Sequence, residues 1–202
     1  MVGQLSNPSL VLPELALRDG ELRLRPWSQD DAAALNAAVA DSVEHLRPWM
    51  EWIAGEPQTV SQRGEWILQS ERDRASGGQL LLGTFVDGAI AGGCGLHARV
   101  GVGGLEIGYW THPEFLRRGV ATAASRLLTS AAFSLPGISF VEIHHDKANV
   151  ASGGVPRKLG FELVDESRKP PTAPGEIGIE CRWRVARAVW LQRQQSSPPA
   201  PD

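Results

Sequence analysis

The chain has 202 residues and a formal net charge of −3, a length that suits one domain with a substantial core. The slight acidity argues against nucleic acid or an anionic membrane surface as the main partner. No apolar run approaches the roughly 20 residues that span a bilayer. The N-terminus lacks the basic start and continuous apolar stretch of a secretory signal. We therefore expect a cytoplasmic protein with no nucleic-acid partner and no membrane partner.

Cysteine and histidine spacing gives no sign of a metal site. Cys94 and Cys181 stand alone, without the CxxC spacing of a redox or zinc motif. The five histidines form no HExxH pattern. We expect no metal, and two reduced thiols that pack in the core.

The chain divides into three parts by composition. Residues 1–19 are predicted to be an N-terminal leader, and residues 20–191 carry the alternating patterns of a folded domain. Residues 192–202, QRQQSSPPAPD, have almost nothing to bury and are predicted to be a disordered tail.

Hydrophobic periodicity predicts the elements of the domain in chain order. The Asp87-Gly88 pair between two apolar runs is a strong hairpin signal. The order strand, two helices, three strands, helix, strand, helix, two strands predicts an α/β domain with a mixed sheet. Strands are expected at 21–27, 79–86, 89–96, 105–111, 138–145, 160–164 and 177–189. Helices are expected at 28–40, from 59 or 61 to about 75, from the turn at 117–122 to about 133, and at 150–159.

The segment 105–133 forms the centre of this pattern. A strand ends at Pro113, and a turn containing Gly119 leads into a helix with apolar residues at helical spacing. Free N–H groups and the helix dipole at such a turn form an anion site, to which Arg117 and Arg118 add positive charge. The alternative is an ordinary strand–turn–helix with both arginines facing water.

Three motifs in order resemble the GNAT family of N-acetyltransferases, and most closely its RimJ/RimL-like branch. They are RRGVAT at 117–122, NVAS at 149–152 and KLGF at 158–161. The resemblance covers about residues 20–190. It implies a GNAT-type mixed, mostly antiparallel sheet that is split between two central parallel strands, here 105–111 and 138–145, and flanked by helices. Acetyl-CoA, or another acyl-CoA such as succinyl-CoA, would bind in the split as co-substrate.

The resemblance also assigns the cofactor-binding residues. Leu116 departs from the Gln or Arg that begins the family's phosphate-binding turn, but the contacts there are mostly made by backbone N–H groups. Asn149 would meet the pantetheine arm through its side-chain amide, although a simple helix-boundary role is the alternative. The backbone of Tyr109, Trp110 and Thr111 would pair with the same arm, and the pyrophosphate would lie on Arg117, Arg118, Gly119, Val120, Ala121 and Thr122.

In this family the amine attacks the thioester directly, so no acyl-enzyme is needed. Many relatives use a tyrosine as the acid, but the matching position here is Pro156. Ser152 matches a serine of RimL-like members and becomes the candidate proton donor to the CoA sulfur; a helix-start hydroxyl is the alternative. Glu106 is the candidate base, with an ion-paired strand residue as the alternative. His144 and His145 point to opposite faces of one strand, and one of them could serve instead.

Acceptor recognition is expected from Trp49 and Trp52, in a segment common in the RimJ/RimL branch, and from His145. A core role is the alternative for the tryptophans. The acceptor could be a protein N-terminus, a lysine or another amine-bearing small molecule. A catalytically silent acyl-CoA-binding module is the alternative function, and a homodimer is left open.

Overall fold

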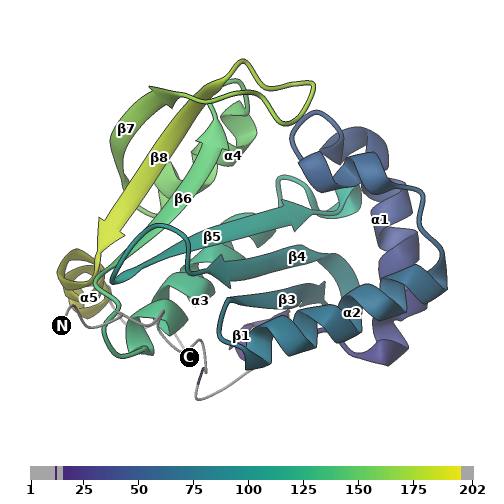
Figure 1. Ribbon diagram of the computed structural model, residues 1–202. Coiled ribbons are helices and arrows are strands. Elements are labelled where there is room, and N and C mark those ends of the chain that lie inside the picture. The colour runs from purple at the N-terminus through teal and green to yellow at the C-terminus, as the bar shows by residue number, and fades with distance from the viewer. Residues whose placement is uncertain (1–11, 13–15, 197–202) are drawn as a thin grey trace, which may run out of the picture.

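The computed structural model describes residue 12 and residues 16–196. Eight strands form one sheet in the order β1-β2-β3-β4-β5-β6-β8-β7 (Figure 1). Every neighbouring pair is antiparallel except β5 and β6, which are parallel. This confirms the predicted mixed, mostly antiparallel sheet. The strands are β1 Leu17–Asp19, β2 Leu22–Pro26, β3 Gln79–Val86, β4 Ala89–His97, β5 Gly104–Thr111, β6 Phe140–Asp146, β7 Glu162–Arg168 and β8 Ile179–Ala186.

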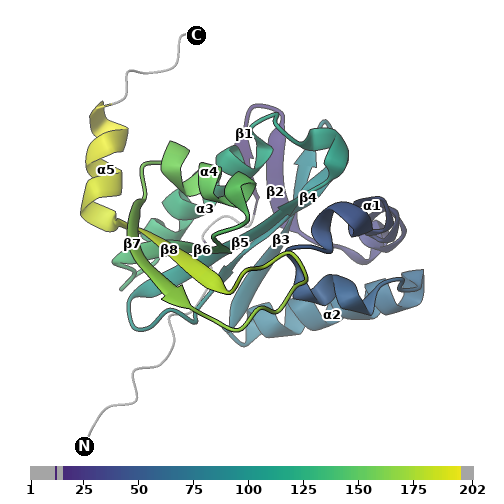
Figure 2. The same cartoon turned by 90° about the horizontal axis from the view of Figure 1, so that it is seen from above.

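Helices cover both faces of the sheet. In Figure 2, α3 and α4 lie on one side, and α1 and α2 on the other. Short 3-10 helices η1 (Gln29–Asp31), η2 (Glu51–Gly55) and η3 (Pro113–Phe115) connect the larger elements. The α-helices are α1 Ala32–Leu46, α2 Val60–Ala75, α3 Val120–Ser134, α4 Val150–Lys158 and α5 Arg187–Ser196.

Each helical layer has its own apolar core. Leu128 and Ala132 of α3 are fully buried in the cluster that includes Leu105 and Val141 of the sheet. On the opposite face, a second cluster joins α1, η2 and α2 to the sheet through Leu35, Val39, Ile53, Ile67 and Phe85. Because both faces are covered, the central strands are apolar on both sides, and polar side chains buried there call for a specific explanation.

The central parallel pair is short. β5 and β6 pair only over Gly104↔Phe140, Leu105↔Val141 and Glu106↔Glu142. Beyond these residues β5 stays with β4 and β6 stays with β8, so the two strands diverge toward their carboxyl ends. The split predicted between 105–111 and 138–145 is therefore present, at the edge where α/β proteins commonly bind ligands.

The two ends of the chain differ from the sequence prediction. β1 pairs with β2 through Leu17↔Leu24, so the folded sheet begins inside the predicted leader, the rest of which lies almost wholly outside the described residues. The last strand ends at Ala186, and α5 continues to Ser196, past the predicted boundary at 191. Trp190 explains the helix, since it is buried against Phe161 and donates from Nε1 to Ser130 Oγ at 3.2 Å. The predicted disordered tail is therefore wrong for 192–196, and 197–202 lie outside the described residues.

Candidate active site

A cavity of about 900 Å³ opens at the diverging ends of β5 and β6. β5 contributes residues 106–110 to its wall, and β6 contributes residues 144–146. Segments far away in the sequence complete the wall, namely the aromatic segment 49–52, part of α2 and the loop between β7 and β8. The split in the sheet therefore opens into this cavity.

The predicted phosphate-binding turn lies between η3 and α3. Gly119 is the N-cap of α3 with φ 79°, and a Cβ built there would meet nothing within 4 Å. Arg117 also has a positive φ, 60°, and both Arg117 and Arg118 are exposed. The N–H groups of the first turn of α3 have no intrahelical acceptor, so they face an open surface beside two cations. This geometry suits an anion such as a pyrophosphate.

One edge of β5 is free beside the split. Tyr109, Trp110 and Thr111 pair with Cys94, Gly93 and Gly92 of β4 on one side. On the other side β6 has already diverged, because its pairing with β5 ends at Glu106. An extended ligand can add to such an edge as a further strand.

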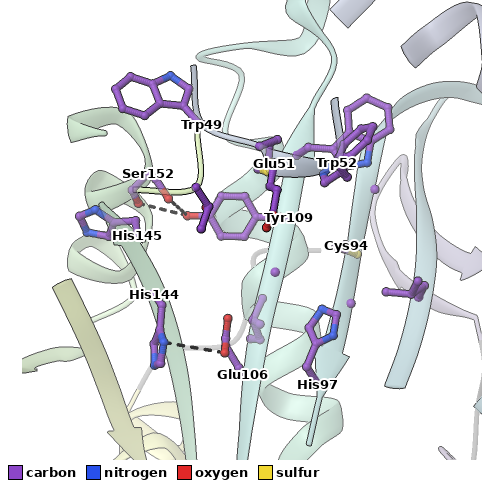
Figure 3. A pocket seen from close by; sticks show the side chains of 18 of the residues that line it. Trp49, Glu51, Trp52, Cys94, His97, Glu106, Tyr109, His144, His145 and Ser152 are labelled. Carbon is purple, nitrogen blue, oxygen red and sulfur yellow. Dashed lines mark hydrogen bonds and ion pairs between the residues drawn. The ribbon is translucent and has the colours of Figure 1, made fainter. Parts of the chain in front are cut away.

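Tyr109 and Ser152 meet across this split. The Tyr109 hydroxyl lies 3.0 Å from Ser152 Oγ and donates to the Ser152 carbonyl at 3.1 Å (Figure 3). Burial raises the pKa of the Tyr109 phenol to about 12, and its bond to Ser152 opposes that rise. Asn149 caps α4, where its Oδ1 accepts from Ser152 N–H at 3.1 Å. The helix-boundary role of Asn149 is thus real, and it leaves the amide NH₂ of the same side chain for a ligand.

Glu106 is buried at the base of the cavity and paired with Arg99. Arg99 Nε donates to Oε2 at 2.8 Å and Nη2 donates to Oε1 at 2.6 Å. Burial favours the neutral acid, but the guanidinium outweighs it, so the pKa of Glu106 lies below its ordinary value. Glu106 is therefore a fixed negative charge whose two oxygens are both engaged.

The neighbouring histidines face opposite sides of β6, as the strand period requires. His144 lies on the same side as Glu106, with its Nδ1 3.8 Å from Glu106 Oε2. His145 faces α4, where its Nε2 accepts from Trp183 Nε1 at 2.9 Å and its Nδ1 lies 2.8 Å from the Asp146 carbonyl. Both ring nitrogens of His145 are thus engaged in the fold, and its predicted contact with the acceptor stays a prediction.

Aromatic side chains wall the end of the cavity opposite Glu106. Trp49 and Trp52 both line it (Figure 3), and Trp52 packs edge-on against Trp110 with ring centroids 6.2 Å apart. The β7–β8 loop reaches this segment, where Gly175 N–H donates to the Pro48 carbonyl at 2.9 Å (Figure 1). A Cβ at Gly175 would come within 2.7 Å of Pro48. We call residues 169–178 the strap, because they cross over the split and reach the opposite half of the molecule.

Sequence reasoning missed three partners in the site. It gave Tyr109 a role only through its backbone and not through its hydroxyl. It did not identify Arg99, or the buried Glu142 that contacts His144. The spacing of Glu142 and His144 in one strand was the available signal, since residues two apart share a face. No group of three His, Cys, Asp or Glu side chains among residues 12 and 16–196 is placed to hold a metal ion. No helix in those ranges is long and apolar enough to cross a membrane.

Comparison with known proteins explains this arrangement. Residues 21–162 match the family model described as an acetyltransferase (GNAT) domain. The chain belongs to the GNAT family of N-acetyltransferases. It is 30% identical over 142 residues to "Putative ribosomal N-acetyltransferase YdaF" of Bacillus subtilis, an alignment covering 69% of this chain and 77% of that protein.

Solved structures of RimL and RimJ share this fold. The ribosomal L7/L12 alpha-N-protein acetyltransferase RimL, solved with coenzyme A, superposes with a TM-score of 0.77 at 17% identity, over 85% of this chain and 97% of that one. Mycobacterium smegmatis RimJ, solved as a complex with CoA-disulfide, gives 0.74 at 20% identity, over 89% and 93%. At these identities the structures support the fold, while the family assignment rests on the sequence matches.

Proposed function

We propose that this GNAT enzyme transfers the acetyl group of acetyl-CoA to a primary amine that enters the cavity and attacks the thioester directly. The observation that carries the proposal is the split between β5 and β6. The open edge of β5 borders the cavity at Tyr109 and Trp110, and the phosphate-binding turn follows the same strand through η3. A thioester held along that edge would reach the cavity from the α3 side, while an amine would approach from the side of α1 and α2.

The cofactor would be held mostly by backbone groups. The pyrophosphate would lie on the N–H groups of residues 117–122, and Arg117 or Arg118 would reach the 3′-phosphate. The pantetheine arm would pair with β5 at residues 109–111 and meet the Asn149 amide. Support comes from the open surface at Gly119 and from the unpaired edge of β5.

Ser152 would donate a hydrogen bond to the sulfur as the C–S bond breaks. Its Oγ lies 3.0 Å from the Tyr109 hydroxyl. With a pKa of about 12, that phenol stays protonated. If its single proton turns from the Ser152 carbonyl, to which it donates in the structure, the phenol can donate to Oγ instead. The Ser152 proton is then directed toward the leaving thiolate. A pair of hydroxyls thus takes the place of the single tyrosine acid that position 156 lacks.

Acetyl is the donor group that the cavity charges favour. A succinyl group needs a free cation for its second carboxylate. The cations lining the cavity are each paired in the structure: Arg63 with Glu56, Arg99 with Glu106 and Lys169 with Glu180. The negative charge of Glu106 would instead attract the ammonium group of the acceptor.

A protein N-terminus is the acceptor we favour. Two relatives carry names that specify ribosomal N-acetyltransferase or alpha-N-protein acetyltransferase activity, and such an acceptor would place the enzyme in the cytoplasm. A lysine or a small amine would reach the same cavity. The tryptophans at its wall suit an acceptor with an apolar or aromatic group near its amine.

Mass spectrometry of a defined reaction tests the proposal. The enzyme is incubated with acetyl-CoA and phenylalanine amide, Nα-acetyl-lysine amide or benzylamine, and a parallel reaction uses succinyl-CoA. We expect acetylated product with one equivalent of released thiol. Background from the protein is expected to be low, because burial raises the pKa of Cys94 to about 12 and that of Cys181 above its ordinary value. Tight CoA binding without product or thiol release from any of these amines, or from peptides with free N-termini, would favour the silent module.

A further inference from the structure

A buried carboxylate holds one ring nitrogen of His144 in place. Glu142 is 1% exposed, and its Oε2 lies 2.6 Å from His144 Nε2. Its other oxygen, Oε1, accepts from Arg184 Nε at 2.7 Å and forms an ion pair with Nη2 of the same guanidinium at 2.5 Å. Both carboxylate oxygens of Glu142 are therefore engaged, one by Arg184 and the other by His144. Glu142 lies behind His144, which itself lines the cavity.

This contact determines which nitrogen of His144 carries the proton. An ionised carboxylate only accepts hydrogen bonds, so Nε2 must be the N–H that donates to Glu142. In the neutral ring Nδ1 then carries the lone pair. Nδ1 lies 3.8 Å from Glu106 Oε2 and 3.9 Å from Glu180 Oε2, which is too far for a hydrogen bond. Among the described residues it has no hydrogen-bond partner, and it stands between two carboxylates that would attract an ammonium group.

We propose that His144 is the general base of the acetyl transfer and that Glu142 is its positioning residue. The proposal rests on the proposed function. Glu106 is less suited to accept a proton, because both of its oxygens are bound to Arg99. His97 also lines the cavity, but no hydrogen bond among the described residues fixes its ring. The charged groups around His144 come from each neighbouring segment: Glu106 of β5, Arg99 before it, Glu142 of β6, Glu180, Arg182 and Arg184 of β8, and Lys169 of the strap.

The proton balance follows from this arrangement. Nδ1 of His144 takes one proton from the acceptor ammonium, and the neutral amine attacks the thioester carbon to form the C–N bond. The C–S bond then breaks, and the second proton of the nitrogen passes to the CoA thiolate through the Ser152 and Tyr109 hydroxyls. His144 returns its proton to water. One amide, one thiol and one released proton result, and no further reactant is needed.

Two amines that differ in protonation test the proposal. Benzylamine is an ammonium ion at neutral pH and needs a base, whereas aniline is already neutral. We expect His144→Gln to lower kcat/KM for benzylamine by about 10²-fold or more, the usual range for general base catalysis. The loss with aniline should be below about tenfold, and the benzylamine loss should shrink as pH rises and the free amine accumulates. His45→Gln on α1 is the matched control and should change neither rate, since His45 does not line the cavity.

The Glu142→Gln variant tests whether Glu142 orients the His144 ring or only supports the fold. A glutamine at 142 can donate to Nε2 and so place the proton on Nδ1; we therefore expect the benzylamine rate to fall at least tenfold while the aniline rate is largely kept. Asp165→Asn removes a carboxylate paired with Arg182 at 3.0 Å on the neighbouring strands and should preserve both rates. Equal losses with the two amines in His144→Gln would overturn the proposal. So would a His97→Gln variant that alone shows the benzylamine-specific loss.

The tautomer can be measured without any activity. Two-bond ¹⁵N–¹H correlations of the imidazole in the wild-type protein should show His144 protonated at Nε2 and, in its neutral form, free at Nδ1. A neutral ring protonated at Nδ1 would contradict the proposal. If the wild-type enzyme acetylates neither amine, the proposed function fails for those acceptors, and the tautomer still decides whether Glu142 orients His144.

Discussion

The only tyrosine of the chain, Tyr109 on β5, places its hydroxyl 3.0 Å from Ser152 Oγ on α4, across the open part of the split. The two residues are 43 positions apart in the sequence. Their contact joins the strand that would hold the cofactor to the helix that would supply the proton.

Tyr109→Phe should lower kcat for acetyl transfer by about tenfold to 10²-fold, close to the cost of losing one donor to developing charge. KM for acetyl-CoA should change less, because the bond matters most as the thiolate forms. Ser152→Ala should likewise lower kcat more than it changes KM for acetyl-CoA. The double variant should have a kcat only slightly below that of either single variant. Full kcat with a raised KM would mean that the pair only binds the cofactor.

The pH dependence of the Tyr109 phenol can be followed by tyrosinate absorbance without interference from another tyrosine. Its pKa is raised from 10.0 to about 12, so the folded protein should show no ionisation through pH 10 and should titrate near pH 12. The folded state prefers the protonated form; stability from this group is therefore complete below pH 10 and is lost as pH rises toward 12. A midpoint near 10 in the folded protein would contradict the burial of this side chain.

Gly119→Val should weaken CoA binding by on the order of 1–3 kcal/mol, because the left-handed backbone strains any β-branched residue. A Cβ at this position would meet no atom within 4 Å, so we expect backbone strain and ligand approach to set the cost. Gly88→Val is a matched control, with φ 81° and equally open space at the β3–β4 turn. Calorimetry should show a loss of CoA affinity only for Gly119→Val. Equal CoA affinity in both folded variants would contradict the phosphate-binding assignment.

Glu56→Ala should lower the free energy of unfolding by about 3–5 kcal/mol, since it leaves the buried guanidinium of Arg63 without its partner. The two side chains are 3% and 5% exposed and 2.6 Å apart. Glu71→Ala breaks an exposed pair with Arg74 on the same helical layer and should cost about 0.2–1 kcal/mol. Urea unfolding measures both values, and similar small losses would show that Arg63 finds water or another acceptor.

Ending the chain after Leu191 should reduce stability by about 1–2 kcal/mol, at roughly 1 kcal/mol for each lost hydrogen bond. The deletion removes Gln194, which donates to Ser130 Oγ at 2.8 Å, and Arg193, which donates to the Gly160 carbonyl at 2.5 Å. A chain ending after Ser196 is the control. An unchanged melting temperature in the shorter chain would restore the predicted boundary at 191.

The sequence predicted most of the sheet because its signals there are local. The hairpin at Asp87-Gly88 gave β3 its observed bounds, and the motif at 117–122 lies at the start of α3. β1 was not predicted, because it has only three residues and forms a strand by pairing with β2. α5 was not predicted, because its sequence is mostly polar and it packs against the domain through one buried tryptophan, Trp190. In both cases a partner distant in sequence determines the structure.

The sequence could predict the site only where backbone N–H groups, rather than side chains, would make the contacts. The turn that we propose to bind phosphate is predicted from Gly119 and its neighbours, since backbone N–H groups need no particular side chain. The pairing of Glu106 with Arg99 and of Tyr109 with Ser152 depends on strand register and helix docking. Side chains two residues apart in a strand share a face, so the sequence alone places Glu142 beside His144. The burial of Glu142 depends on its pairing with Arg184 of β8, which the sequence does not reveal.

The strap would allow the proposed acceptor site to change independently of the proposed cofactor site. Its contact with Pro48 joins residues 169–178 to the aromatic segment 46–53, and neither stretch includes the proposed phosphate-binding turn at 117–122. Substitutions in either stretch would change which amines can enter the cavity, while the residues proposed to bind coenzyme A would stay the same. The close fit of Gly175 against Pro48 implies that a substitution in one stretch must be compatible with the residues of the other.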